Sequence, residues 1–165
     1  MIKAKDYGIV ILDGFFHNPE GEKVIDFQVS EKPVYIGLLT QMPTNSVDGS
    51  GYDEPSDAEY HRVKLNKKDK FTDENYMTQA KTGTVDESKE DRSLPVYITN
   101  NSSIIFPEAT EAWGTIVGFG LFRSKEGNDI FIWGSITEPD SEESVYIDKE
   151  EIAIIRPEYF KITLE

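Results

Sequence analysis

The chain has 165 residues, of which 38% are hydrophobic, 12% aromatic and 29% charged, a composition that suits one folded domain with a real core and excludes a disordered chain. Its formal net charge of −14, from 31 acidic and 17 basic residues, argues against binding to nucleic acid or to anionic membranes, since both depend on Lys and Arg. The sequence has no cysteine, which excludes disulfides, thiolate metal sites and a Cys nucleophile.

The N-terminal segment has apolar residues near helical spacing. They predict a short amphipathic helix within residues 2–16, and a strand over 7–12 is the alternative. The apolar stretch at 8–12 is too short for the core of a signal peptide, and no apolar run approaches the length of a membrane span. We therefore expect no signal peptide and no membrane insertion.

The first clear strand is the β-branched and aromatic run at 34–39, which a long polar loop follows at 43–59. Residues 60–65 alternate in side-chain type, as a strand with one wet face should. A group of basic residues begins in that strand, and we expect it to form the exposed end of the strand and its turn: Arg62, Lys64, Lys67, Lys68 and Lys70.

The second half of the chain is a series of short apolar runs separated by turns. Residues 66–95 are polar and predict an insertion with room for one irregular strand. Further strands are predicted at 96–99, 103–106, 115–122, 130–136, 152–155 and 159–164. The segment 124–129 has the composition of a hairpin turn, 107–114 could hold a turn of helix, and 138–144 reads as an acidic loop.

Seven to nine short strands predict an all-β fold, namely a single-domain antiparallel β-sandwich that is jelly-roll-like, with a short N-terminal helix. We expect residues 1–32 to form that helix and a connecting segment. Residues 33–165 would then form the sandwich domain, with the polar insertion around 66–95.

No residue pattern indicates catalysis or a cofactor. The two histidines, His17 and His61, lack a partner at metal-ligand spacing, and no nucleophile elbow is present. The loop carboxylates Asp48, Asp53, Glu54 and Asp57 leave a bound cation open as an alternative, although acidic loops are usually only solvated. We expect Trp113 and Trp133 to pack in the core and not to stack on sugars.

Several motifs occur in the order found in a family of small tailed-phage proteins. They include Tyr35-Ile36-Gly37-Leu38-Leu39-Thr40, the Gly49-Ser50-Gly51-Tyr52 loop, Phe106-Pro107-x-Ala109-Thr110-x-x-Trp113-Gly114-Thr115, Gly118-Phe119-Gly120-Leu121-Phe122 and Trp133-Gly134. The chain resembles the proteins commonly labelled phage tail fibre or minor tail proteins. The polar stretch 66–95 is longer than the family pattern, and Glu59 stands where that pattern has a glycine.

The resemblance implies a non-enzymatic structural component of a tailed bacteriophage virion, without catalytic, cofactor or metal residues. We expect a protein that is made in the host bacterial cytoplasm and assembles by self-association. It would also contact other virion proteins, as a tail fibre, baseplate or other tail-associated part. A head fibre or decoration protein is one alternative. The other is a carbohydrate-binding adhesion module that contacts a host surface glycan or partner through exposed aromatics, with Tyr52, Tyr60 and Tyr76 as candidates.

Overall fold

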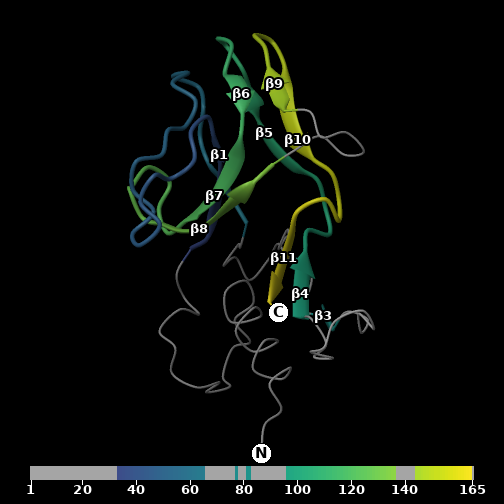
Figure 1. The fold of residues 1–165 in the computed structure, drawn as a ribbon. Helices are drawn as coiled ribbons and strands as arrows, with labels where there is room; N and C mark the ends of the chain where they lie inside the picture. The colour runs from purple at the N-terminus through teal and green to yellow at the C-terminus, as the bar shows by residue number, and fades with distance from the viewer. Residues whose placement is uncertain (1–32, 66–76, 78–80, 83–95, 137–143, 165) are drawn as a thin grey trace, which may run out of the picture. The chain divides into compact units, whose positions relative to one another are not determined.

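The computed structural model describes residues 33–65, 77, 81–82, 96–136 and 144–164. All regular structure in these residues is antiparallel β, and none of them is helical. Figure 1 shows the arrangement of the strands and labels β1 and β3 to β11. The all-β prediction is therefore confirmed for this part of the chain, while the predicted N-terminal helix lies outside the described residues.

The chain divides into two compact units that are each assembled from separate segments. One unit comprises Met1–Lys32, Asn66–Ile104 and Ile155–Glu165, and the other comprises Pro33–Leu65 and Ile105–Ile154. The predicted division into 1–32 and 33–165 stays a prediction.

A four-stranded sheet is the largest element of the second unit. Its order is β2-β1-β7-β8, with bounds Val63–Lys64, Tyr35–Leu39, Gly118–Phe122 and Ile130–Ser135. β1 pairs with β7 from Tyr35↔Phe122 to Leu39↔Gly118, and β7 and β8 form the hairpin expected around residues 124–129. The central strands β1 and β7 are mostly buried, which explains their nearly continuous apolar sequences.

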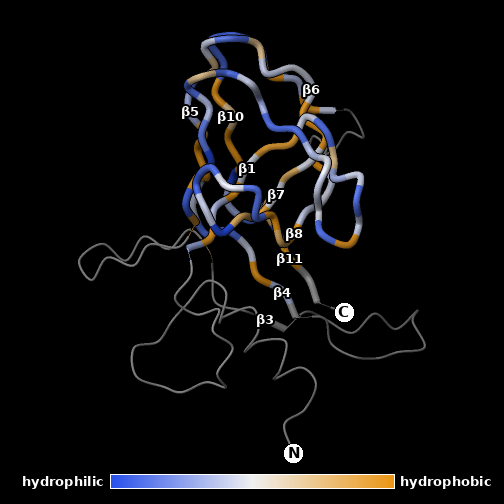
Figure 2. Tube along the Cα trace, turned by 90° about the vertical axis from the view of Figure 1, so that its left-hand side faces the viewer, coloured by the Kyte–Doolittle hydropathy of each residue, from blue (hydrophilic) through white to orange (hydrophobic). Residues whose placement is uncertain are grey.

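Two shorter strand pairs follow one another along the chain. β5 (Ile104–Glu108) pairs with β10 (Ile152–Ile155), and β6 (Gly114–Ile116) pairs with β9 (Val145–Ile147). Backbone hydrogen bonds continue between the two pairs, from the Trp113 N–H to the Ile147 carbonyl and from the Ala109 N–H to the Glu151 carbonyl. The four strands thus form one long antiparallel ribbon, in which Figure 2 shows β5 and β10 side by side.

The first unit contains a three-stranded sheet of order β11-β4-β3, with bounds Lys161–Leu164, Val96–Thr99 and Lys81–Thr82. β3 falls in the insertion where one irregular strand was expected. Next to the sheet the Asn100 side chain is buried, donates to the Arg156 carbonyl (2.8 Å) and accepts from the Phe160 N–H (2.9 Å). This amide therefore ties the chain after β4 to the turn before β11.

One local prediction was wrong and two were confirmed only in part. Residues 107–114 contain no turn of helix, since β5 extends to Glu108 and β6 begins at Gly114. The strand predicted at 60–65 is confirmed only at its end, where Val63–Lys64 pairs with β1 and the Leu65 N–H donates to the Val34 carbonyl. The predicted run 115–122 is divided at Val117 between two sheets. Val117 donates its N–H to the Leu39 carbonyl, which marks the point where the chain passes from β6 to β7.

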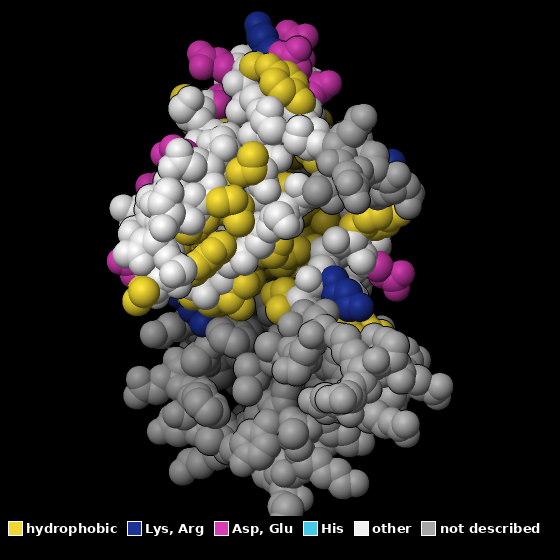
Figure 3. Space-filling model, viewed as in Figure 1, with side chains coloured by type: hydrophobic (Ala, Val, Ile, Leu, Met, Phe, Trp, Pro, Cys, Tyr) yellow, Lys and Arg dark blue, Asp and Glu magenta, His cyan; other side chains and the backbone are white. Residues whose placement is uncertain are grey.

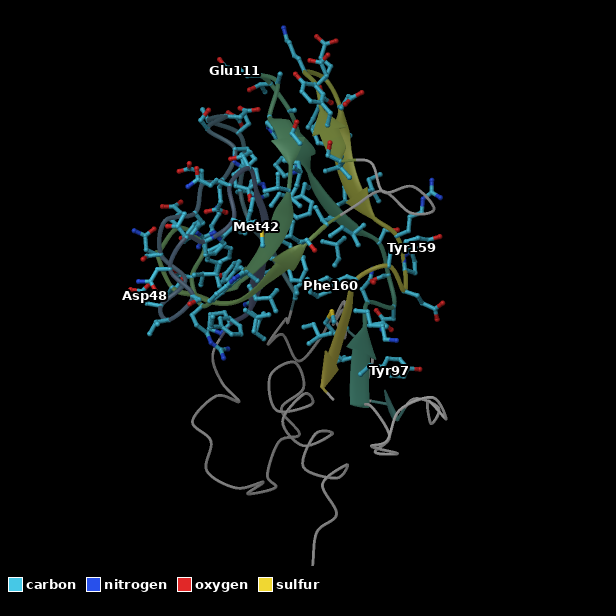
Figure 4. The ribbon with its side chains drawn as sticks, viewed as in Figure 1. Met42, Asp48, Tyr97, Glu111, Tyr159 and Phe160 are labelled. Carbon is cyan, nitrogen blue, oxygen red and sulfur yellow. The ribbon has the colours of Figure 1, made fainter. Side chains whose placement is uncertain are left out.

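The core of the second unit lies on and beside the four-stranded sheet. Side chains of three strands, Leu39, Phe122 and Ile130, form a buried cluster, against which Tyr35, Met42, Tyr52 and Trp133 pack. Figure 4 shows Met42 against the sheet, whereas Asp48 of the same loop lies at its outer side. The loop after β1 therefore covers part of the sheet, and the core role expected for Trp113, which is buried, is confirmed.

Candidate functional site

Arg62 lies at the centre of the most connected polar cluster among the described residues. It stands one residue before β2, and only 5% of its surface is exposed. The expectation that this basic residue belongs to an exposed strand end was therefore wrong. A buried guanidinium needs a partner for each donor, because its desolvation is otherwise uncompensated.

All five N–H groups of Arg62 have an acceptor. Nε and Nη2 donate to the Glu54 carboxylate, with a shortest distance of 2.6 Å, and Nη2 also reaches the Tyr52 hydroxyl at 3.4 Å. Nη1 donates to the carbonyls of Ser124 (2.9 Å) and Gly127 (2.8 Å) in the β7–β8 turn. Although burial opposes the charge, these bonds to Glu54 and its negative charge raise the pKa of Arg62.

A pair of glycines makes room for this cluster on the sheet. Gly37 of β1 pairs with Gly120 of β7, and a Cβ on Gly120 would lie 2.7 Å from the Phe122 ring. The guanidinium carbon of Arg62 lies 3.4 Å from the centroid of that same ring, in cation–π contact. The glycines thus let the ring lie close to the sheet, where Arg62 covers it.

The two predicted contact residues that the structure describes meet at this cluster. The Tyr60 hydroxyl donates to Glu54 (3.0 Å) and accepts from the Leu38 N–H (2.8 Å), and its ring meets that of Trp113 edge-on at 5.2 Å. The Tyr52 ring is tilted against Phe122 at 5.5 Å. Burial raises the pKa of both phenols, so both remain neutral donors at physiological pH.

Their place in the cluster gives both tyrosines an internal packing role, and each side chain is only partly exposed. A role in glycan or partner contact stays a prediction. The third candidate, Tyr76, lies outside the described residues.

Asp57 forms a second polar centre in the same loop. Its side chain is buried and accepts from the Thr110 hydroxyl and N–H (both 2.6 Å), the Trp113 indole N–H (2.9 Å) and the Glu59 N–H (3.0 Å). These bonds hold the pKa of Asp57 far below its usual range, and the bond from the Thr110 hydroxyl has the largest effect. The carboxylate therefore fastens the loop before β2 to the bend between β5 and β6.

A cavity of about 360 Å³ lies beside the Arg62 cluster. Its lining comes from the loop before β2 and from the β7–β8 turn: Glu54, Pro55, Ala58, Glu59, Tyr60, His61, Arg62, Lys125 and Glu126. His61, Lys125 and Glu126 are exposed, whereas the less exposed lining residues Glu54, Tyr60 and Arg62 are hydrogen-bonded to one another. The cavity thus has a polar, exposed rim beside groups that are bonded within the protein.

The loop carboxylates considered for a cation do not converge. Asp48 accepts from the Ser50 N–H (2.9 Å), which lowers the pKa of its carboxyl, while Glu54 faces Arg62 and Asp57 faces Trp113. Within the described ranges, no three His, Asp or Glu side chains are grouped so as to hold a metal ion. Across the same residues, no helix is long and apolar enough to cross a membrane.

Comparisons with known proteins give one family. A family model described as "Podophage GP4 fiber I protein gp80" matches residues 25–146, which is well over half of the chain. No curated protein and no solved structure matches. The match includes the Arg62 cluster, the four-stranded sheet and the motifs that suggested a phage fibre protein. The chain belongs to this family of podophage fibre proteins.

Proposed function

We propose that the chain is a non-enzymatic subunit of a tail-associated phage fibre, which assembles by self-association and attaches to other virion proteins. The match over residues 25–146 to a fibre family carries this proposal, and it supports a virion location and a structural role. Within this role, we propose a fibre of the tail, and a fibre of the head is the alternative.

The geometry supports a scaffold. Arg62 and Asp57 use their polar groups for hydrogen bonds within the protein, and these bonds fasten loops to the sheet. We further propose that the antiparallel sheets pack as a β-sandwich. A stiff β scaffold suits a part that must transmit force or hold a fixed position in a particle.

Gold-labelled antibody imaging of purified particles, together with mass spectrometry of the same particles, tests this proposal. We expect the protein in the particles and the label at the tail or its fibres. Label over the capsid would make the protein a head fibre or decoration protein. Absence from the particles, combined with a protein that stays monomeric at high concentration, would contradict the structural proposal altogether.

A carbohydrate-binding role is the second candidate, favoured by the cavity beside Tyr60 and its exposed polar rim. Sugar binding usually combines an aromatic surface with a few polar groups on loops of a rigid scaffold. A glycan array with the wild type and with His61→Ala and Lys125→Ala tests it, since both changes alter the rim and leave the Arg62 bonds in place. Equal signals for all three proteins would contradict a site at this cavity.

A further inference from the structure

The exposed apolar side chains of the described residues are concentrated on the ribbon. Six large hydrophobic residues are exposed, and four of them belong to it: Ile105, Tyr146, Ile152 and Ile154. Figure 2 shows the apolar stretch of β10 beside β5. Scattered surface hydrophobics are ordinary, but a group on one element marks an interaction surface.

Three of these residues lie on one face of the β5–β10 pair. Ile104 and Phe106 are buried, so the intervening Ile105 points to the opposite face, where it is 56% exposed. In β10, Ile152 (47%) and Ile154 (54%) alternate with the less exposed Ala153 and Ile155. We call Ile105, Ile152 and Ile154 the isoleucine face.

Charge indicates what kind of molecule can cover this face. β10 has no charged residue, but the turn before it is mainly acidic, and Arg156 follows it directly, with Glu158 two residues further on. The exposed acidic residues Asp148, Glu150 and Glu151 precede it, accompanied by Lys149, and the exposed Arg156 follows it. Figure 3 shows acidic side chains gathered at the ends of β6 and β9.

An antiparallel arrangement of two β10 strands satisfies both features. It places the isoleucine faces of two copies against each other and brings Arg156 of each copy to the acidic turn of the other. A parallel arrangement would place like charges together at both ends. Since such an isologous contact is formed twice around a two-fold axis, each favourable pairing counts twice.

We propose that the isoleucine face is a self-association surface, on which a second copy of this chain packs with its β10 antiparallel. The proposal rests on the proposed function, because self-association is part of it, and adds where the copies meet. The face is completed only by the second copy, since half of each isoleucine otherwise stays in water.

Analytical ultracentrifugation of the whole chain tests the surface. We expect Ile154→Asp to raise the dissociation constant of the self-associated form at least about tenfold, because it places a carboxylate in an apolar contact. Val47→Asp is the matched control, since Val47 is 92% exposed in the loop after β1 and does not belong to the isoleucine face. This change should leave the dissociation constant nearly unchanged.

A charge exchange provides a second readout that does not depend on the isoleucines. Arg156→Glu should weaken association, and adding Glu150→Lys to it should restore most of the loss, whereas Glu150→Lys alone should weaken association too. Circular dichroism checks that each variant is folded.

The outcomes separate this proposal from the function on which it rests. If the wild type associates but neither Ile154→Asp nor the charge exchange changes its dissociation constant, the surface is wrong and self-association stands. If the wild type stays monomeric at the highest soluble concentration, self-association itself is wrong, and the surface with it.

Discussion

A single buried arginine connects three parts of the second unit. Arg62 bonds to Glu54 in the loop after β1, to the carbonyls of the β7–β8 turn, and contacts the Phe122 ring. Its position in the sequence, in a run of basic residues between His61 and Val63, gave no sign of burial. The sequence does contain the partner Glu54 and the glycines Gly37 and Gly120 that make room for the cluster. Only the folded structure shows that these residues lie together.

Replacing Arg62 tests this connection. Arg62→Met should lower the free energy of unfolding by about 3–5 kcal/mol, because it leaves the Glu54 carboxylate without its cation. The stability of Arg62→Lys should lie between those of the wild type and Arg62→Met, since an ammonium group keeps the charge but cannot reach both Glu54 and the two turn carbonyls. Urea denaturation measures both, with Lys149→Met on an exposed turn as control. Full stability in Arg62→Lys would show that the planar bonding geometry is unimportant.

Asp57 predicts a specific response to acid. Its folded-state pKa is depressed, so its contribution to stability is complete above the unfolded-state pKa of about 3.9 and is lost as the pH falls through the folded-state pKa. Asp57→Asn should therefore be less stable than the wild type at neutral pH, and the difference should shrink only below about pH 4. Thermal unfolding of both proteins across this range measures it. A difference independent of pH would mean that the charge of Asp57 contributes nothing.

The glycine pair Gly37 and Gly120 at the centre of the four-stranded sheet leaves little room for a side chain. A Cβ on Gly120 would lie 2.7 Å from both Ile130 Cδ1 and the Phe122 ring. Gly120→Ala should therefore cost about 1–3 kcal/mol through overpacking, despite the better strand propensity of alanine.

A double-mutant cycle separates crowding from other causes. Gly120→Ala should cost less stability in the Phe122→Leu background than in the wild type, because the smaller side chain leaves room for the new methyl group. Equilibrium unfolding of the two single variants and the double variant gives the coupling energy. Strictly additive losses would contradict the proposed crowding of the ring.

The positions of the strands could be predicted from the sequence better than the pairing between them. The apolar runs that became β1, β4, β8 and β10 were predicted nearly to their ends, because each is bounded by turn or polar residues. β9 was missed, since Val145–Ile147 has only three residues and directly follows an acidic segment. The irregular path of 107–114 also escaped prediction, because it depends on Asp57, which is more than fifty residues away in the sequence.

For the candidate site, the sequence identified the right loop but not the contacts that its side chains make within the protein. Tyr52, Tyr60, Glu54 and Asp57 were all singled out, as aromatic contacts or cation ligands. In the structure, Glu54 faces Arg62 and Asp57 faces the Trp113 indole. An acidic side chain in a loop has the same appearance in a sequence whether it faces water, a metal or a buried donor, so residue type alone could not decide.

The whole molecule carries a net charge of −14, which opposes contact between copies. The isoleucine face and Arg156 provide local attraction, but two strongly acidic bodies repel each other over distances that salt screens. Self-association should therefore strengthen several-fold between about 0.05 and about 0.5 M NaCl, as the Debye length shortens. Sedimentation at a series of salt concentrations measures it. Weaker association at high salt would mean that attraction between charges dominates the contact.

The interleaved segments of the two units have a consequence for how the protein is made. β1 cannot pair with β7 until Phe122 has been synthesised, and β4 cannot pair with β11 until Leu164 has. Closing such long loops slows folding, and a nascent strand such as Tyr35–Leu39 must wait without its partner. We therefore expect folding to complete only after nearly the whole chain has left the ribosome. Fragments that end before β11 should then be degraded or aggregate in the cell, since they lack partners for strands already made.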